Sequence, residues 1–199
     1  MRVPELSFFP GLLCLVNAQS IAEPAGNCHP TCITPTATND SLSFGQHYAV
    51  VNLDLVSVVV EPIANTSAGS AFINNMAHWI NAVHSQEPPP LSIFTRVYFS
   101  NARKPEIVPG SGLSQITVNE GTINDTNTTL YPAFQPDIAA GDVVLEKTGT
   151  YAGAGNAFEQ VLRAQKIDTV ILSGIRSAGS ILNTAYRLYD MQYTTYVPL

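Results

Sequence analysis

The stretch from Lys166 to Tyr189 constrains the fold of this chain more than any other part of the sequence. Thr169 to Leu172 is a short apolar run rich in β-branched residues, typical of a strand buried in a parallel sheet. Further on, the apolar residues follow a helical period at Ile181, Leu182, Ala185, Leu188 and Tyr189. We therefore expect a strand, a tight turn and then a helix.

Strand and helix patterns alternate along the rest of the chain. Apolar runs predict strands at 48–53, 93–99, 142–146 and 193–197, and helical spacing predicts helices at 70–86 and 157–164. Pro62 and the polar cluster 65–70 predict a loop, and residues 100–130 predict a long functional loop or lid. This order predicts an α/β fold: a three-layer α/β/α Rossmann-like sandwich around a mainly parallel sheet of five or six strands.

The amino terminus has the composition of a secretory signal. Arg2 precedes an apolar run at 6–16, and Val16-Asn17-Ala18 provides the small residues that a cut after Ala18 requires. We therefore expect a signal peptide at 1–18, an irregular lead-in at 19–45, a folded domain at 46–199 and a secreted protein. The apolar run is too short to span a bilayer, so no membrane association is expected after its removal. The alternative is a buried N-terminal segment.

Cysteine usage and glycosylation sequons agree with secretion. Cleavage after Ala18 would remove Cys14 and leave Cys28 and Cys32, which could close a small disulfide. They could instead bind a metal together with His29, but no further Cys completes a structural zinc site. Four N-x-S/T sequons fit a glycoprotein; they begin at Asn39, Asn65, Asn124 and Asn127.

Charge and composition limit the partners. Fifteen acidic residues against nine basic ones give a net charge of −6, which argues against nucleic acid. Hydrophobic residues make up 45% of the chain, enough for a substantial core. A small-molecule partner is therefore expected, and a homo-oligomer is left open.

Polar residues follow the predicted strands where chemistry would be expected. Asp54 and Lys147 each end a strand, and Ser180 lies where the helix after the last turn begins. Because the carboxyl ends of parallel strands share one edge of a sheet, these three could form a catalytic set. The N–H groups of Arg176 and Ser180 could stabilise an oxyanion, and Tyr151 and Ser177 are candidates for substrate binding.

These residue types also have purely structural interpretations. An Asp at a strand end often caps a turn, a Lys after a strand is often exposed, and a Ser at a helix start is often an N-cap. His78 and His84 lie six residues apart on the predicted helix, which does not place two metal ligands on one face. We expect them to be solvated or hydrogen-bonded.

Three segments, in this order, resemble the isochorismatase-like hydrolases, a superfamily that includes nicotinamidases and other amidohydrolases. The segments are H-Y-A-V-V-N-L-D, G-D-V-V-L-E-K and L-R-A-Q-K-I-D-T-V-I-L-S-G-I-R-S-A-G-S-I-L-N-T-A-Y, and the resemblance covers about residues 46–199. It implies a triad of Asp, Lys and Cys, of which the Asp falls on Asp54 and the Lys on Lys147. It also implies a cis peptide bond between Ile175 and Arg176.

The sequence departs from this family at several positions. Ser180 occupies the place of the nucleophilic Cys, and a hydroxyl is a poorer nucleophile unless a base activates it. Val56 stands where the family often has Gln. No His follows the 93–99 strand to bind the metal of nicotinamidases, so neither metal nor other cofactor is expected. Family members continue beyond the last strand, so the chain resembles a form truncated at its C-terminus.

Two functions are consistent with this pattern. The first is a secreted hydrolase that uses Asp54 and Lys147 on a small amide or on a vinyl ether of the isochorismate type, for which Ser180 could be a bystander. The alternative is an inactive member of the fold that binds a small ligand or a protein. A nicotinamide dehydrogenase is disfavoured because Gly153-Ala154-Gly155 lacks the third glycine, and a serine esterase because the G-x-S-x-G motif is absent.

Overall fold

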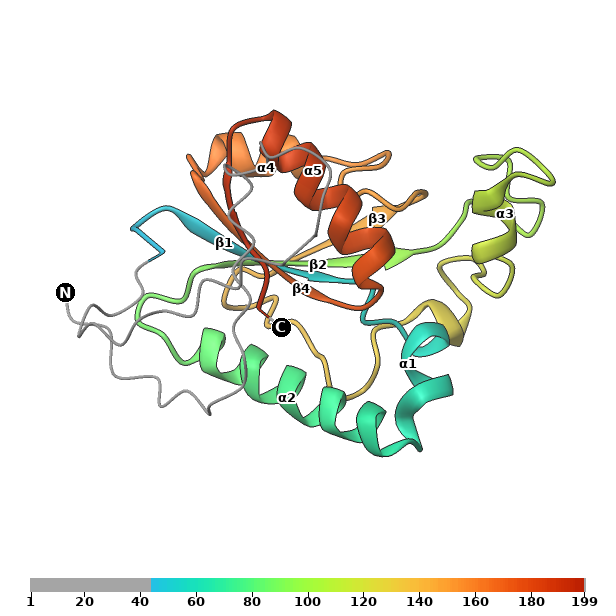
Figure 1. Cartoon of the computed structure of the whole chain (residues 1–199), viewed down its shortest axis with the longest axis horizontal. Coiled ribbons are helices and arrows are strands. Elements are labelled where there is room, and N and C mark those ends of the chain that lie inside the picture. The colour runs from blue at the N-terminus through green and yellow to red at the C-terminus, as the bar shows by residue number, and fades with distance from the viewer. Residues whose placement is uncertain (1–43, 199) are drawn as a thin grey trace, which may run out of the picture.

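A computed structural model describes residues 44–198, which form a three-layer α/β sandwich (Figure 1). One sheet has the strand order β3-β2-β1-β4-β5, and every neighbouring pair is parallel. The strands are β1 (Tyr48–Leu53), β2 (Leu91–Val97), β3 (Val143–Lys147), β4 (Thr169–Gly174) and β5 (Thr194–Tyr196). Helices α1 (Ser57–Ala64) and α2 (Ser67–His84) cover one face, and α4 (Phe158–Ala164) and α5 (Leu182–Asp190) cover the other. The predicted fold class is confirmed, with five strands.

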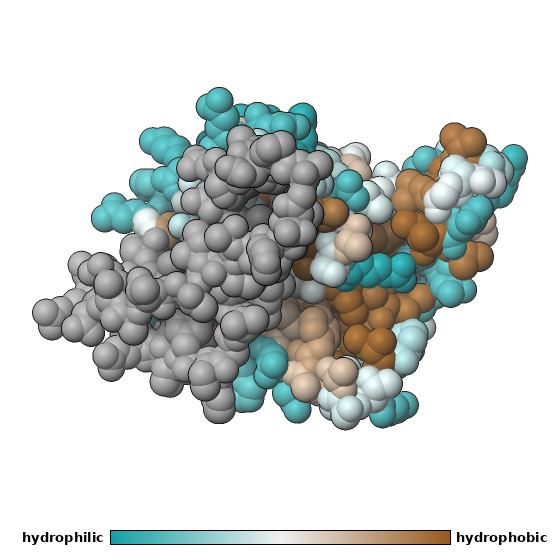
Figure 2. Space-filling model, in the orientation of Figure 1, coloured by the Kyte–Doolittle hydropathy of each residue, from teal (hydrophilic) through white to brown (hydrophobic). Residues whose placement is uncertain are grey.

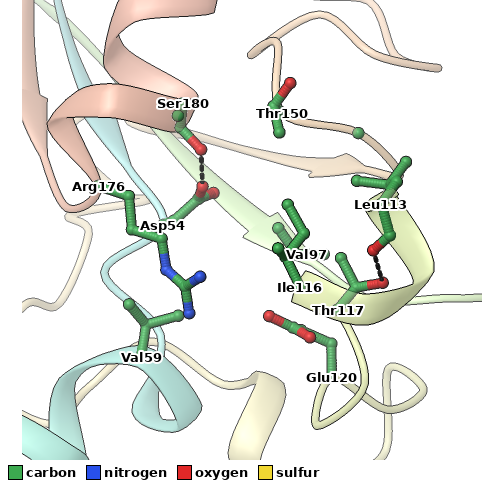
Figure 3. A pocket seen from close by; sticks show the side chains of 12 residues that line it. Asp54, Val59, Val97, Leu113, Ile116, Thr117, Glu120, Thr150, Arg176 and Ser180 are labelled. Atoms are coloured by element: carbon green, nitrogen blue, oxygen red, sulfur yellow. Dashed lines mark hydrogen bonds between the residues drawn. The ribbon is translucent and has the colours of Figure 1, made fainter. Parts of the chain in front are cut away.

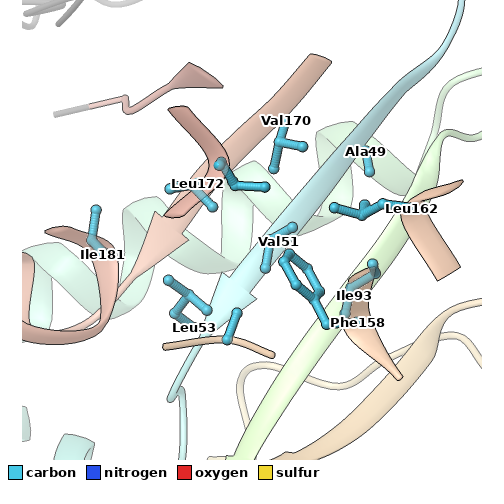
Figure 4. Close-up of a cluster of buried hydrophobic side chains, with 11 residues drawn as sticks. Ala49, Val51, Leu53, Ile93, Phe158, Leu162, Val170, Leu172 and Ile181 are labelled. Carbon is cyan, nitrogen blue, oxygen red and sulfur yellow. The ribbon is translucent and has the colours of Figure 1, made fainter. Parts of the chain in front are cut away.

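The sheet is apolar on both faces because helices cover both. On the α4–α5 side, alternate residues of β1 and β4 pack against Phe158 and Leu162, all with no exposed surface (Figure 4). On the other side, Val50 and Ile171 pack against Val83 of α2. Burying one such side chain contributes about 1.5–3 kcal/mol. This two-sided core fixes the strands whose ends carry the polar residues.

The predicted loop around Pro62 is wrong. Pro62 lies inside α1, and α2 begins at Ser67, where the hydroxyl of Thr66 accepts a hydrogen bond from the N–H of Gly69 at 2.9 Å. A proline inside a helix costs about 3 kcal/mol. Val60 of α1 is completely buried against Phe94 of β2 and α2, and this tertiary packing favours the helix.

The predicted long loop at 100–130, the α3 excursion, contains only short helices, α3 (Gly112–Ile116) and η2 (Thr126–Thr128). The α3 excursion extends away from the sheet beyond β2, and Arg96 Nε holds it by donating to Thr128 O at 2.8 Å. Figure 2 shows apolar residues gathered over the α3 region and on the neighbouring surface of the domain. Exposed apolar residues of this excursion are Val108, Ile116, Val118 and Ile123. The excursion forms one wall of the cleft described below.

Several sequence predictions concern residues outside the described part of the chain: the signal peptide, the Cys28 and Cys32 pair, and the Asn39 sequon. Of the other sequons, Asn65 and Asn124 are exposed, whereas Asn127 Nδ2 donates to Asn119 O at 2.6 Å. Between residues 44 and 198, no helix combines the length and hydrophobicity needed to cross a bilayer.

The two histidines of α2 lie in different surroundings. His84 Nε2 lies 2.8 Å from Asp142 Oδ2, and His78 is exposed. These positions agree with solvated or hydrogen-bonded roles. Within the described residues, no three His, Cys, Asp or Glu side chains cluster in a way that could hold a metal ion.

Candidate active site

Lys147 ends β3 and is completely buried beneath the carboxyl edge of the sheet. Its Nζ lies 2.8 Å from Asp54 Oδ2, 2.9 Å from Thr150 O and 3.0 Å from Ser180 Oγ. An ammonium has three donors, and these three oxygens provide one acceptor for each. The direction of the Lys147 ammonium is therefore fixed by these three acceptors.

Asp54 directly follows β1 and receives hydrogen bonds on both carboxylate oxygens. Thr95 Oγ1 of β2 donates to Oδ1 at 2.9 Å, and Ser180 Oγ donates to Oδ2, which also contacts Lys147. The N–H of Asp54 in turn donates to Thr95 Oγ1 at 3.1 Å. Asp54 has φ +54°, a left-handed conformation that Asp tolerates better than most residues. These contacts orient the carboxylate toward the serine.

Ser180 is positioned by the turn between β4 and α5. Gly174 ends β4 with φ +120°, and a Cβ there would lie 2.2 Å from Leu53 O, so only glycine fits. Arg176 follows with φ +70°, and a π-helical turn, η3 (Ser177–Ile181), leads into α5. Such turns are frequent at functional sites. The expected strand, tight turn and helix are confirmed.

The expected cis bond between Ile175 and Arg176 is not present. Within residues 44–198 the cis peptide bond is Glu87–Pro88. The change of direction after β4 is made instead by the positive φ angles of Gly174 and Arg176. The N–H of Arg176 donates to no backbone carbonyl of the described chain, so it is available to a ligand.

The cluster opens into a cleft of about 440 Å³, counted to its open mouth (Figure 3). Asp54 and Ser180 lie at one end, and the α3 excursion forms the opposite wall. The other lining residues are Val59, Val97, Leu113, Ile116, Thr117, Glu120, Gly149, Thr150, Arg176 and Gly179. Four aliphatic side chains thus alternate with polar and charged groups in the cleft lining, a combination suited to a small molecule that carries polar groups.

The structure brings together four of the six residues singled out in the sequence: Asp54, Lys147, Ser180 and Arg176. The other two do not line the cleft. The hydroxyl of Tyr151 donates to Glu159 Oε1 at 3.0 Å and its ring packs on Phe158, while Ser177 is exposed on the turn.

Sequence reasoning missed three polar groups of the site. Thr95 lies inside a strand, Thr150 contributes a backbone oxygen, and Glu120 belongs to the irregular excursion. The only sequence signal for Thr95 was a polar residue in an apolar strand, and for Glu120 an acidic residue in a weakly charged loop. Both features are common at positions that have no function.

The family model of the isochorismatase domain matches residues 48–198, which is most of the chain. The chain belongs to the isochorismatase family. Within this family member, Asp54, Lys147 and Ser180 occupy one hydrogen-bonded cluster at the carboxyl edge of the sheet. No protein with a curated description matches this sequence.

Solved structures share the fold of this isochorismatase-family protein at low sequence identity. An isochorismatase-like hydrolase from Alkaliphilus metalliredigens has a TM-score of 0.62 and 15% identity over 76% of this chain and 79% of that one. A cysteine hydrolase from Pseudomonas syringae pv. phaseolicola 1448A has a TM-score of 0.63 and 19% identity, over 76% of this chain and 70% of that one. N-carbamoylsarcosine amidase from Thermoplasma acidophilum has a TM-score of 0.59 and 19% identity, over 76% of this chain and 81% of that one.

Proposed function

We propose that this protein is a hydrolase of small amides in which Ser180 is the nucleophile. One observation carries the proposal: the Ser180 hydroxyl donates to Asp54 and accepts from Lys147 in the same buried cluster. Nucleophilic catalysis requires a nucleophile, a base within hydrogen-bond reach of it, and a third group that orients both. Ser180, Asp54 and Lys147 occupy these three positions. The names of the structural neighbours, a cysteine hydrolase and an amidase, support this chemistry.

The proposed reaction has two stages. Asp54 takes the Ser180 proton as the hydroxyl oxygen bonds to the amide carbon, and the protonated Asp54 then gives that proton to the departing nitrogen. The C–N bond breaks, leaving an ester on Ser180. Water, deprotonated by Asp54, attacks this ester and restores the serine as the acid product leaves. Lys147 stabilises the negative charge on Asp54 and on the attacking oxygen.

The N–H groups at the start of the last helix would stabilise the oxyanion. Arg176 immediately precedes η3, and its N–H makes no backbone hydrogen bond within residues 44–198. A helix start carries about half a positive charge. We assign the oxyanion contact to the N–H groups of Arg176 and Ser180.

The second candidate is ligand binding without turnover. The specific observation in its favour is the serine itself, because a hydroxyl needs stronger activation than a thiol. Vinyl-ether hydrolysis of the isochorismate type is a third candidate, in which Asp54 protonates a carbon atom of the substrate and Ser180 takes no part.

We also propose that the protein is secreted, as residues 1–18 and the exposed sequons at Asn65 and Asn124 indicate.

Trapping the acyl enzyme separates these functions. Wild type mixed with a small activated ester and quenched should show by mass spectrometry one added acyl group on the peptide that contains Ser180, and Ser180→Ala should show none. Hydrolysis that survives Ser180→Ala would exclude the serine mechanism and favour the vinyl-ether type of reaction. A folded wild type that turns over neither esters, amides nor isochorismate would leave only the binding function.

The pH dependence of hydrolysis provides a separate prediction. Burial lowers the pKa of Lys147 below its ordinary value of 10.5, and the ion pair with Asp54 opposes this shift only in part. Below the lowered pKa the ammonium is charged and active, and above it the charge is lost. We expect kcat/KM to fall on the alkaline side with an inflection below pH 10.5. The exposed Lys166→Arg variant should keep this inflection; a profile that stays flat through pH 10.5 would contradict the assignment.

A further inference from the structure

Glu120 lies in the cleft wall with a carboxyl oxygen that receives no hydrogen bond from residues 44–198. The residue is only 7% exposed, and its Oε2 has no hydrogen-bond partner within the described chain. In Figure 3 its carboxyl group points into the cleft, toward the side from which Arg176 extends. A buried polar group without a partner is costly, so such groups in native structures call for an explanation.

Charges around Glu120 do not supply the missing partner. Burial raises the pKa of Glu120, and its own backbone N–H together with the charges of Arg176 and Lys104 opposes this rise only in part. Neither cation forms an ion pair with Glu120, and Lys104 Nζ instead donates to Thr117 O and Val118 O. The nearest charges are thus already engaged or too distant.

Arg176 is the second unpaired charge of the cleft. It is exposed and forms no ion pair with any carboxylate of residues 44–198. Its guanidinium extends from the turn toward Val59 and Glu120, away from Ser180 (Figure 3). A guanidinium is well matched to a carboxylate, which it can bind through two parallel hydrogen bonds.

We propose that Glu120 and Arg176 select the substrate: a small amide that carries, at the end remote from its scissile bond, both a carboxylate and an N–H donor. The carboxylate binds Arg176 and the N–H group donates to Glu120 Oε2. This inference rests on the proposed hydrolase function for the position of the scissile bond at Ser180. The aliphatic side chains of Val97, Leu113 and Ile116, which line the cleft, contact the carbon chain of the substrate between its two ends.

Four primary amides of matched length test this selection. L-Glutamine has both groups, 4-carbamoylbutyrate has only the carboxylate, 4-aminobutanamide has only the amine, and butanamide has neither. Binding to wild type is measured by NMR titration, and hydrolysis by release of ammonia. We expect L-glutamine to bind most tightly and butanamide most weakly, with each group contributing roughly 10-fold.

Two variants assign each preference to its residue. Glu120→Gln should reduce the preference for amine-bearing over amine-lacking amides by roughly 10-fold and leave the carboxylate preference unchanged. Arg176→Gln should reduce the preference for carboxylate-bearing amides by a similar factor and leave the amine preference unchanged. Arg103→Gln, which removes an exposed charge outside the cleft, should leave both preferences unchanged. Equal binding of the four amides, binding of none, or preferences that both variants leave intact would overturn the inference.

The two proposals can fail separately in this experiment. Ordered binding without ammonia release would keep the selection by Glu120 and Arg176 and remove the hydrolase function. Equal hydrolysis of all four amides would keep the hydrolase function and remove the selection.

Discussion

Replacing Lys147 by methionine is expected to lower the free energy of unfolding by about 3–5 kcal/mol at neutral pH, because it leaves the Asp54 carboxylate buried without its counter-charge. The Lys147 side chain has no exposed surface and that of Asp54 is 8% exposed, so little water can replace the ammonium. The two remaining acceptors, Thr150 O and Ser180 Oγ, also lose this donor. Chemical denaturation followed by circular dichroism measures the change.

A second substitution shows whether the unpaired charge is the cause. In the double variant Asp54→Asn with Lys147→Met neither member of the buried ion pair is charged, so stability should recover by more than half of the loss. Arg163→Met is the matched control, since its ion pair with Glu159 is on the surface, with 62% of the Arg163 side chain exposed, and should matter little. A double variant as unstable as the single one would show that lost packing, not charge, is responsible.

Replacing Asp54 by asparagine is expected to lower the kcat of the folded protein for small amides by about 10²–10⁴-fold, and to lower its stability because Lys147 loses its counter-charge. Asparagine has the same shape, but its single amide oxygen can accept from Thr95 or from Lys147 and not from both, and it cannot take the Ser180 proton. Rates are measured under saturating substrate, with circular dichroism to confirm folding.

A control at the opposite edge of the sheet separates this effect from a general loss of charge. Asp168 directly precedes β4, and Asp168→Asn removes one carboxylate far from Ser180. This variant should retain the wild-type kcat. An Asp54→Asn protein that also retained it would rule out Asp54 as the general base.

Local patterns predicted most of the elements because period and turn chemistry are encoded within a few residues. The run before Ser173 and the spacing after Ile181 define β4 and α5 to within about two residues. Prediction failed at Pro62, where the proline signal is local but the burial of Val60 that overrides it is not. It also failed at the Ile175–Arg176 bond, where the expectation came from resemblance.

The candidate site was predicted in part for the same reason. Asp54 and Lys147 could be placed together because both end strands of one parallel sheet, and that rule needs no coordinates. Tyr151 could not be placed, because its hydroxyl is directed to Glu159 by the packing of its ring on Phe158. Thr95 gave no signal, since a threonine in a strand is ordinary.

By itself, the sequence determined the α/β alternation and the strand ends at which Asp54 and Lys147 lie, because both follow from local periodicity. Only the tertiary structure decided that Ser180 reaches both of them and that Glu120 faces the same cleft as Arg176. These residues come from distant parts of the chain. Their meeting depends on how the α3 excursion and the turn after Gly174 pack against the sheet, and no local pattern contains that packing.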